Sequence, residues 1–176
     1  MKELLKRHSF SVAFLVLFIG AVFLFADGDE AIQQLNGFTM ETFSTYAANS
    51  ELSRFNRHPV NVPFIASSRM IEVLLMAQEI AGLSGGAFDV TVGPLVNLWG
   101  FGPDLAVFDT VPTPEQIAAA KDRVGFQYLR ISPSSQEIRK VVDLYVDLSA
   151  IAKGYAVDQL ADYLDEAGVQ NYFLEI

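Results

Sequence analysis

The apolar positions at the start of the chain form one almost unbroken stretch. Residues 10–26 are apolar apart from one serine and one glycine, with three basic residues before them and the acidic run 27–30 after them. This charge order is typical of a segment whose N-terminus stays in the cytoplasm. A helix of about 17 residues, at roughly 1.5 Å per residue, nearly crosses the hydrocarbon core of a bilayer. We therefore predict a membrane anchor or signal peptide over residues 1–26.

An uncleaved anchor is favoured over a cleaved signal peptide. The best cleavage site follows Ala26, and Leu24 stands where a small residue is preferred. A buried core helix is a weaker alternative, because the stretch is terminal and flanked by charge. With either an anchor or a signal peptide, the rest of the chain lies outside the cytoplasm.

Beyond a polar linker over residues 27–39, periodic patterns predict three helices. Residues 67–83 place apolar side chains at helical spacing, begin with two serines that can cap, and stop at glycines. A second helix opens at Thr113, with a proline in the first turn and a glutamine placed for a capping box, and ends near Gly125. The third helix spans 149–167.

Strand patterns occupy the intervals between these helices. Residues 128–132 and 138–142 are rich in β-branched and alternating positions around the polar turn 133–136, which predicts a hairpin. Residues 172–176 predict a further strand. Because strands and helices mix without strict alternation, the pattern indicates an α+β fold rather than a doubly wound sheet. The length after the anchor, residues 40–176, suits one domain.

Composition narrows the chemistry. The chain has 21 acidic and 12 basic residues, a net charge of −9, which makes nucleic acid an unfavourable partner. It has no cysteine, and its two histidines are His8 in the leading segment and an isolated His58. Disulfides, thiolate chemistry, a histidine zinc site and a serine–histidine triad are therefore excluded. Catalysis must use carboxylates, hydroxyls, backbone groups, a lysine or an imported metal.

The glycine-rich stretch GGAFDVTVGPLVNLWGFG, residues 85–102, is the most informative. Glycine lets the backbone pass close to a bulky group, and a bound ligand is one candidate for that group. The alternative, which composition favours, is a packing corner whose aromatic side chains fill the core. Asp89 lies between Phe88 and Val90. A carboxylate in this position must be satisfied by backbone donors, a cation or a ligand.

A second stretch, residues 145–158, suits a phosphate. A strand delivers Asp147, and the turn after it opens a helix whose first amides are free, with Lys153 one turn further on. A carboxylate with nearby carbonyls can also hold magnesium. An ordinary helix cap is an equally weighted alternative. Gly154 inside the predicted helix indicates a close approach by another group.

The segment 44–56 reads as a helix end running into a polar turn. Tyr46 either stacks on an aromatic ligand or is an ordinary boundary tyrosine, and the second reading is favoured from this segment alone.

Taken in order, STY at 44–46 with NSELSRFN at 49–56, the glycine-rich stretch 85–102 and VDLSAIAKGYAVD at 146–158 resemble the ApbE family of FAD:protein FMN transferases. The resemblance extends from Tyr46 to Ile176. It implies a mixed sheet-and-helix domain related to the T-fold. It also implies a reaction in which magnesium assists the splitting of FAD, FMN is joined through a phosphoester to a Thr or Ser of an acceptor protein, and AMP is released.

The resemblance further implies a location and a set of site residues. The acceptors would be flavin-carrying subunits of membrane redox complexes, and the domain would face the periplasm from the cytoplasmic membrane. The carbonyl of Ala150 would bind Mg²⁺. The positions that match FAD-contacting residues are Met40 and Tyr46 near the flavin, Ala87, Phe88 and Asp89, and Asp147 and Lys153 near the diphosphate and ribose.

The match departs from the family pattern at two places. After Met40 the family continues with Gly-Thr, a strand and a long helix before it reaches the STY motif, and here only three residues intervene. The family also continues beyond the position of Ile176 into a half that supplies an Asp and a Thr as magnesium ligands. We therefore expect the domain to be incomplete and this chain not to catalyse transfer as written. A magnesium-dependent FAD pyrophosphatase and a non-catalytic, membrane-tethered flavin-binding fragment are the alternatives.

Overall fold

The structure, a computed structural model, describes residues 42–103 and 111–174. The predicted anchor, the linker and Met40 lie outside these residues. In the part of the chain that is described, no helix has the length and apolar character needed to cross a bilayer. The described residues fall into two units, one ending at Ala152 and the other beginning at Lys153. Each unit is described by itself.

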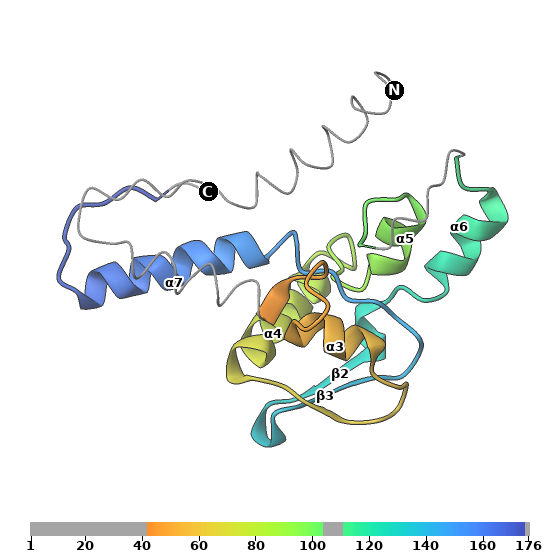
Figure 1. The fold of residues 1–176 in the computed structure, drawn as a ribbon, viewed down its shortest axis with the longest axis horizontal. Helices are drawn as coiled ribbons and strands as arrows, with labels where there is room; N and C mark the ends of the chain where they lie inside the picture. The colour runs from red at the N-terminus through yellow and green to blue at the C-terminus, as the bar shows by residue number, and fades with distance from the viewer. Residues whose placement is uncertain (1–41, 104–110, 175–176) are drawn as a thin grey trace. The chain divides into compact units, whose positions relative to one another are not determined.

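Most of the secondary structure belongs to the first unit (Figure 1). Four helices precede or flank a small antiparallel sheet, and two 3-10 turns adjoin its strands. The elements, in chain order, are α3 (Glu51–Arg57), β1 (Phe64–Ile65), α4 (Ser68–Leu83), α5 (Gly93–Leu98), α6 (Pro114–Lys121), η1 (Phe126–Tyr128), β2 (Leu129–Ser132), η2 (Pro133–Ser135), β3 (Glu137–Lys140) and α7 (Ala152–Glu166).

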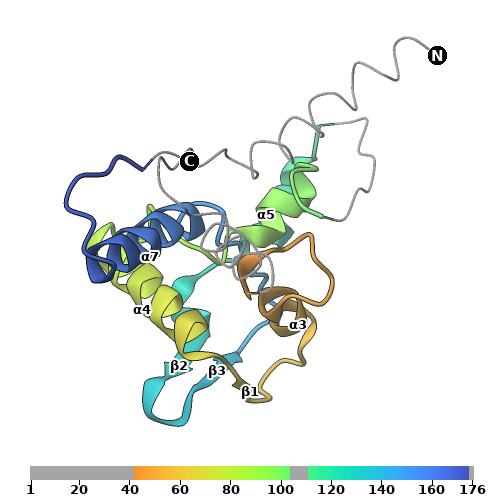
Figure 2. The same cartoon turned by 60° about the vertical axis from the view of Figure 1, so that its left-hand side comes forward.

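The sheet has the strand order β1-β3-β2, with both pairs antiparallel. Ile138 on β3 stands opposite Phe64 on β1 and Ile131 on β2. The helix α4 lies over β2 (Figure 2), and the side chain of Gln78 donates a hydrogen bond of 2.6 Å to the carbonyl of Leu129. This bond joins the middle of the helix to the first residue of the strand. The mixture of elements confirms the predicted α+β class.

The core of the first unit sits along α4. Ser67 caps this helix by accepting a hydrogen bond from the amide of Met70, as its sequence predicts. Residues at helical spacing then bury one face. In α3, Leu52 and Phe55 are fully buried as well. The buried apolar residues of α4 are Met70, Ile71, Val73, Leu74, Ala77 and Ala81.

The predicted capping box is present at the start of α6. The amide of Thr113 donates to Gln116 Oε1 at 2.8 Å, and the amide of Gln116 donates to Thr113 Oγ1 at 3.3 Å. The helix ends at Lys121, earlier than predicted, because the chain tightens there into turns in which Val124 donates to the carbonyl of Lys121. The predicted hairpin is confirmed as β2 and β3, joined through η2 and a left-handed Gln136.

Two predicted elements are wrong. Residues 49–56 are not a helix end running into a turn. Instead a turn comes first, and the helix α3 begins after it at Glu51. Ser50 caps this helix by accepting from the amide of Ser53 at 3.0 Å. The sequence reading overlooked this serine cap.

The second error concerns the predicted strand at 172–176, since Tyr172–Leu174 form no strand. An isolated strand has no partner for its backbone groups. Tyr172 instead turns back within the second unit, where its hydroxyl donates to Asp165 Oδ1 at 2.8 Å.

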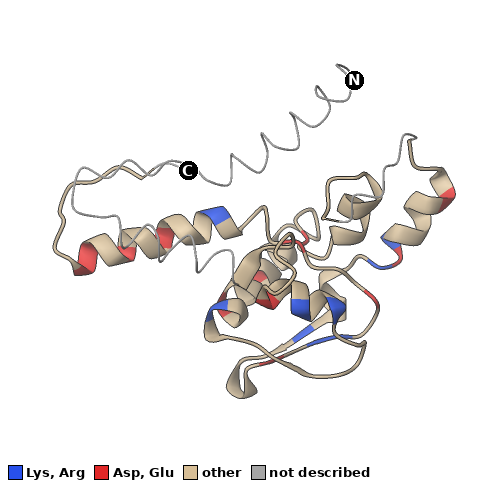
Figure 3. Cartoon of the chain, viewed as in Figure 1, with Lys and Arg blue, Asp and Glu red and all other residues tan. Residues whose placement is uncertain are grey.

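The second unit consists, in its described part, of α7 and the residues that follow it. The predicted third helix is confirmed, although it begins at Ala152 rather than at Ser149. Tyr155, Leu160 and Leu164 are buried along the helix. Its acidic residues gather toward its C-terminal half (Figure 3), and its last turn has no basic residue to offset the helix dipole.

Candidate active site

The glycine-rich stretch 85–102 and the segment 145–147 lie side by side in the first unit. Val92 forms a parallel bridge with Tyr145, and the amide of Asp147 donates to the carbonyl of Val90 at 2.8 Å. The two segments approach so closely that only glycine fits at position 93. A Cβ there would lie 2.4 Å from Tyr145 Cδ1 and 2.5 Å from the Tyr145 carbonyl oxygen. The strand predicted to deliver Asp147 is therefore a short extended segment held by a single bridge.

Tyr46, from the first motif, joins this pair. Its hydroxyl donates a 2.9 Å hydrogen bond to the carbonyl of Phe101, at the end of the glycine-rich stretch. Partial burial, and then the negative charge of Asp147, raise the pKa of the Tyr46 phenol above its ordinary value. About half of the side chain, 53%, is still exposed. The phenol thus lies within electrostatic reach of Asp147 while one side of the ring faces solvent.

Asp147 begins the turn that leads to α7. Its Oδ1 accepts a hydrogen bond of 2.8 Å from the amide of Ser149, two residues further on. The amides of Ile151 and Ala152 both donate to the carbonyl of Leu148. Ser149 and Ala150 are exposed. Asp147 therefore closes this turn and does not cap α7, which begins only at Ala152.

Asp89 has a different environment, although the two aspartates follow similar apolar residues. Its Oδ1 accepts hydrogen bonds from the amide and the hydroxyl of Thr91, at 2.8 and 2.7 Å. Its Oδ2 accepts from the amide of Phe126 at 2.7 Å. The hydroxyl of Thr91 in turn accepts from the amide of Gly125 at 2.7 Å. Of the three ways to satisfy this carboxylate that the sequence left open, the protein's own donors provide one; the predicted contact with FAD stays a prediction.

The glycine-rich stretch does not bury all of its aromatic residues. Trp99 is 46% exposed and Phe101 is 75% exposed. The interpretation that these side chains fill the core is therefore wrong for both. Ala87 is exposed and Phe88 is half-buried, following two glycines with positive φ. The stretch thus exposes two large aromatic residues, one of which bonds to Tyr46 through its carbonyl, and sequence reasoning had assigned neither to a site.

The remaining predicted residues stay untested. Lys153 lies in the first turn of α7, in the second unit. No group of three or more metal-binding side chains occurs among residues 42–103 and 111–174. Ala150 is exposed, three residues after Asp147, whose carboxylate already accepts a hydrogen bond from Ser149 with one oxygen. Mg²⁺ usually takes one or two protein oxygens and completes its six ligands with waters and substrate phosphates. The predicted contact of the Ala150 carbonyl with Mg²⁺ stays a prediction.

Sequence reasoning missed Asn56, the last residue of the NSELSRFN motif. Its side-chain amide donates to the carbonyl of Val146 at 2.9 Å, and its Oδ1 accepts from the amide of Val146 at 2.8 Å. Asn56 is buried. A buried asparagine at the end of a helix is a signal that such a residue bonds distant backbone.

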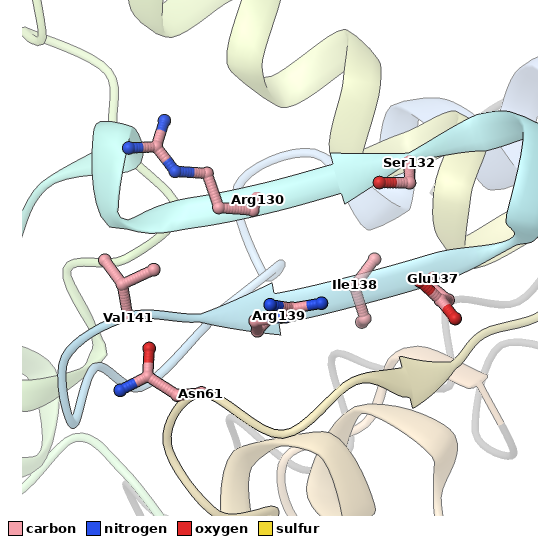
Figure 4. A pocket seen from close by; sticks show the side chains of 7 residues that line it. All are labelled: Asn61, Arg130, Ser132, Glu137, Ile138, Arg139 and Val141. Atoms are coloured by element: carbon pink, nitrogen blue, oxygen red, sulfur yellow. The ribbon is translucent and has the colours of Figure 1, made fainter.

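A separate hollow of about 370 Å³ lies on the face of the hairpin, away from these motifs in sequence. Arg130 on β2 stands directly opposite Arg139 on β3. Figure 4 shows its lining, which includes none of the predicted site residues. The lining residues are Asn61, Arg130, Ser132, Glu137, Ile138, Arg139 and Val141.

A sequence model of the ApbE family matches residues 11–176. The chain belongs to the ApbE family. Among curated relatives, the FAD:protein FMN transferase of Vibrio cholerae is 46% identical over 148 residues, 84% of this chain and 42% of the relative. The Escherichia coli K12 protein of the same name is 38% identical over 86% of this chain and 44% of its own length. This ApbE chain therefore spans less than half the length of these relatives.

Solved ApbE structures have the same fold. The flavin transferase ApbE of Vibrio cholerae aligns with a TM-score of 0.81 and 44% identity, over 89% of this chain and 50% of that one. The apo form of the Pseudomonas stutzeri flavinyl transferase ApbE aligns with a TM-score of 0.78 and 37% identity, over 84% and 48%. These alignments confirm the ApbE-like fold that the motifs implied.

Proposed function

We propose that this chain carries the flavin-binding part of an FAD:protein FMN transferase. The observation that carries the proposal is the meeting of three motifs in one place. Tyr46 bonds to Phe101 and lies near Asp147, and Asp147 is bonded through its amide to Val90. The names of the ApbE relatives from Vibrio cholerae and Escherichia coli, FAD:protein FMN transferase, support the same activity.

The residues at this place suit the parts of FAD. The exposed faces of Tyr46, Trp99 and Phe101 offer a stacking surface for the isoalloxazine ring. The turn after Asp147 exposes Ser149 and Ala150 where the chain enters α7, which leaves this turn accessible to the diphosphate. A carboxylate and a diphosphate repel each other unless a hydroxyl or a cation lies between them. A ribose hydroxyl would meet this need, in agreement with the ribose contact that the family resemblance implies for Asp147.

The proposed reaction is a substitution at the phosphorus of the FMN half. The oxygen of an acceptor Thr or Ser forms the new P–O bond, the pyrophosphate bond to AMP breaks, AMP leaves, and the hydroxyl proton passes to solvent. Positioning and electrostatic stabilisation dominate such reactions. Magnesium, when bound, would neutralise the charge that develops on the diphosphate. The carbonyl of Ala150 would be one of its ligands, as the family resemblance implies.

Titration of FAD into the purified chain tests the proposal. We expect saturable quenching of flavin fluorescence that Asp147→Asn weakens and that the hairpin variant Arg130→Gln leaves unchanged. Lack of saturable binding by the folded wild-type chain would contradict the proposal.

The bound sample then separates the candidate activities. After Mg²⁺ and an acceptor protein are added, covalent flavin fluorescence on the acceptor indicates transfer. Release of FMN and AMP with an unmodified acceptor indicates the pyrophosphatase, and FAD that stays intact and bound indicates a non-catalytic binding fragment. The expectation that this chain alone does not catalyse transfer is tested by the same samples.

We further propose that the domain is tethered to the outer side of the cytoplasmic membrane through residues 1–26, next to its acceptor subunits. The basic, apolar and acidic order of this segment supports the proposal. Membrane fractionation of cells, followed by protease treatment of spheroplasts, tests it. Recovery of the intact chain in the cytosol would overturn it.

A further inference from the structure

The backbone of Val146 is held by a side chain as if by a neighbouring strand. In an extended segment the N–H and C=O of one residue point to one side, and those of the adjacent residues point to the other. On one side, both groups of Val146 bond to the side chain of Asn56, at 2.8 and 2.9 Å. On the other side, the amide of Asp147 bonds to Val90 and Tyr145 bridges to Val92. Asn56 therefore occupies the place of a missing third strand.

Lys140 bonds to the main chain of Asn56. This lysine is only 2% exposed, and its ammonium donates a 2.6 Å hydrogen bond to the main-chain carbonyl of Asn56, in the last turn of α3. A cation is favourable at the C-terminal end of a helix. Its nearest carboxylate oxygen, Asp143 Oδ1, is 3.9 Å away on a side chain that is 68% exposed. Burial lowers the pKa of the Lys140 ammonium, which shows that the charge is held against a cost of desolvation.

We propose that Lys140 and Asn56 are positioning residues, which fix the place of Asp147 through the backbone of Val146. The chain of contacts is continuous, from Lys140 Nζ to the Asn56 carbonyl, from the Asn56 side chain to Val146, and from Val146 to the next residue, Asp147. The consequence for flavin binding rests on the proposed function, whereas the placement of Asp147 does not.

Titration of the Tyr46 phenol tests the placement directly. Because the charge of Asp147 contributes to the raised pKa of Tyr46, a displaced Asp147 lowers that pKa toward the ordinary value. We expect Asn56→Ala and Lys140→Met to shift the Tyr46 pKa downward, in the direction that Asp147→Asn shifts it. The measurement is ¹³Cζ-tyrosine NMR across alkaline pH, with the Tyr46 signal assigned by its loss in Tyr46→Phe.

Matched controls separate positioning from general damage. Asn49→Ala removes an exposed asparagine just before α3, and Arg139→Met removes a cation from the exposed face of β3. Both should leave the Tyr46 titration unchanged. Lys140→Arg retains a donor for the Asn56 carbonyl and should restore most of the wild-type pKa if it folds. Lys140→Met keeps the apolar stem of the side chain, and so provides a folded variant if Asn56→Ala unfolds.

FAD affinity gives the functional arm. We expect Asn56→Ala and Lys140→Met to raise the Kd for FAD about tenfold, equivalent to about 1.4 kcal/mol, with the controls unchanged. A folded Lys140→Met or Asn56→Ala variant with the wild-type Tyr46 pKa would overturn the inference. If the wild type binds no FAD while the Tyr46 pKa still shifts in the variants, the placement stands and the proposed function fails.

Discussion

Two aspartates in similar sequence settings have different surroundings in the folded chain. Asp89 follows Ala-Phe and Asp147 follows Tyr-Val, and each lies where an apolar segment meets a turn. Asp89 accepts three hydrogen bonds from the protein, two from Thr91 and one from Phe126. Asp147 accepts a local bond from Ser149 and faces the phenol of Tyr46 electrostatically.

The difference separates two roles that the motifs do not distinguish. The bonds of Asp89 join the glycine-rich stretch to the segment after α6, so its carboxylate holds the architecture of the site. Asp147 precedes an exposed turn, and its charge raises the pKa of the half-exposed Tyr46, so its carboxylate is placed to meet a ligand. A carboxylate with many protein donors is expected to contribute to stability, and one that faces open aromatic surface is expected to contribute to binding.

The largest expected effect is on stability, at Asp89. Asp89→Ala leaves the Thr91 amide, the Thr91 hydroxyl and the Phe126 amide without their acceptor, and should lower the free energy of unfolding by about 3 kcal/mol. Urea denaturation followed by circular dichroism measures this loss. Asp122→Ala, at an exposed position beyond α6, is the matched control and should change stability by less than about 0.5 kcal/mol. Equal losses of unfolding free energy in Asp89→Ala and Asp122→Ala would show that Asp89 has no special role in stability.

The next effect concerns the bridge that places the two aspartate segments side by side. Gly93→Ala puts a Cβ within 2.5 Å of the Tyr145 carbonyl oxygen, and the backbone must separate to admit it. We expect a loss of about 2 kcal/mol in unfolding free energy, as for an overpacked core. Gly82→Ala, in α4 with no atom of the described chain within 4 Å of its Cβ, should instead be neutral or stabilising by up to about 1 kcal/mol. Thermal melting curves of Gly93→Ala and Gly82→Ala measure whether each substitution lowers or raises stability.

Local signals predicted the helices and the hairpin. Ser67 and the Thr113–Gln116 box start α4 and α6 because capping needs only residues three positions apart. The strand β1 was missed, since two residues paired with β3 from a distance leave no periodic pattern. The strand predicted at 172–176 failed for the related reason that strand propensity does not supply a partner.

The sequence predicted which residues belong to the candidate site but not how they contact one another. Tyr46 and Asp147 stand out in their motifs, whereas their proximity depends on hydrogen bonds across 90 residues, such as those between Asn56 and Val146. The exposure of Trp99 and Phe101 could not be read from composition, since aromatic residues near glycines pack inward or face solvent according to the tertiary structure.

A smaller effect on stability and a larger one on binding are expected at Asp147. Asp147→Asn keeps an oxygen that can accept from Ser149 and removes the charge beside Tyr46. Unfolding free energy should fall by less than about 1 kcal/mol, while the Kd for FAD rises about tenfold. Fluorescence titration and urea denaturation of the same samples measure both. A stability loss as large as that of Asp89→Ala, with unchanged affinity, would reverse the assignment of roles.

The smallest effect is a pH dependence that reports the Tyr46–Asp147 contact. The phenol pKa is raised above 10.0 in the folded chain, so from about pH 10 up to the raised value the unfolded state binds fewer protons than the native state. The free energy of unfolding therefore falls as pH rises through this window, and below it the contribution is fully present. Tyr46→Phe should remove this part of the alkaline loss.

Control variants separate this term from the other alkaline titrations. Tyr172→Phe removes a loss of the same sign, since a hydrogen bond to Asp165 and burial raise the pKa of Tyr172. Lys140 contributes with the opposite sign, because its lowered pKa lets the native ammonium lose its proton before the unfolded one does. If Asp147 lies where its charge acts on Tyr46, the double variant Tyr46→Phe with Asp147→Asn should show no further change in alkaline slope beyond Tyr46→Phe. Independent, additive slopes would show that the two side chains do not interact.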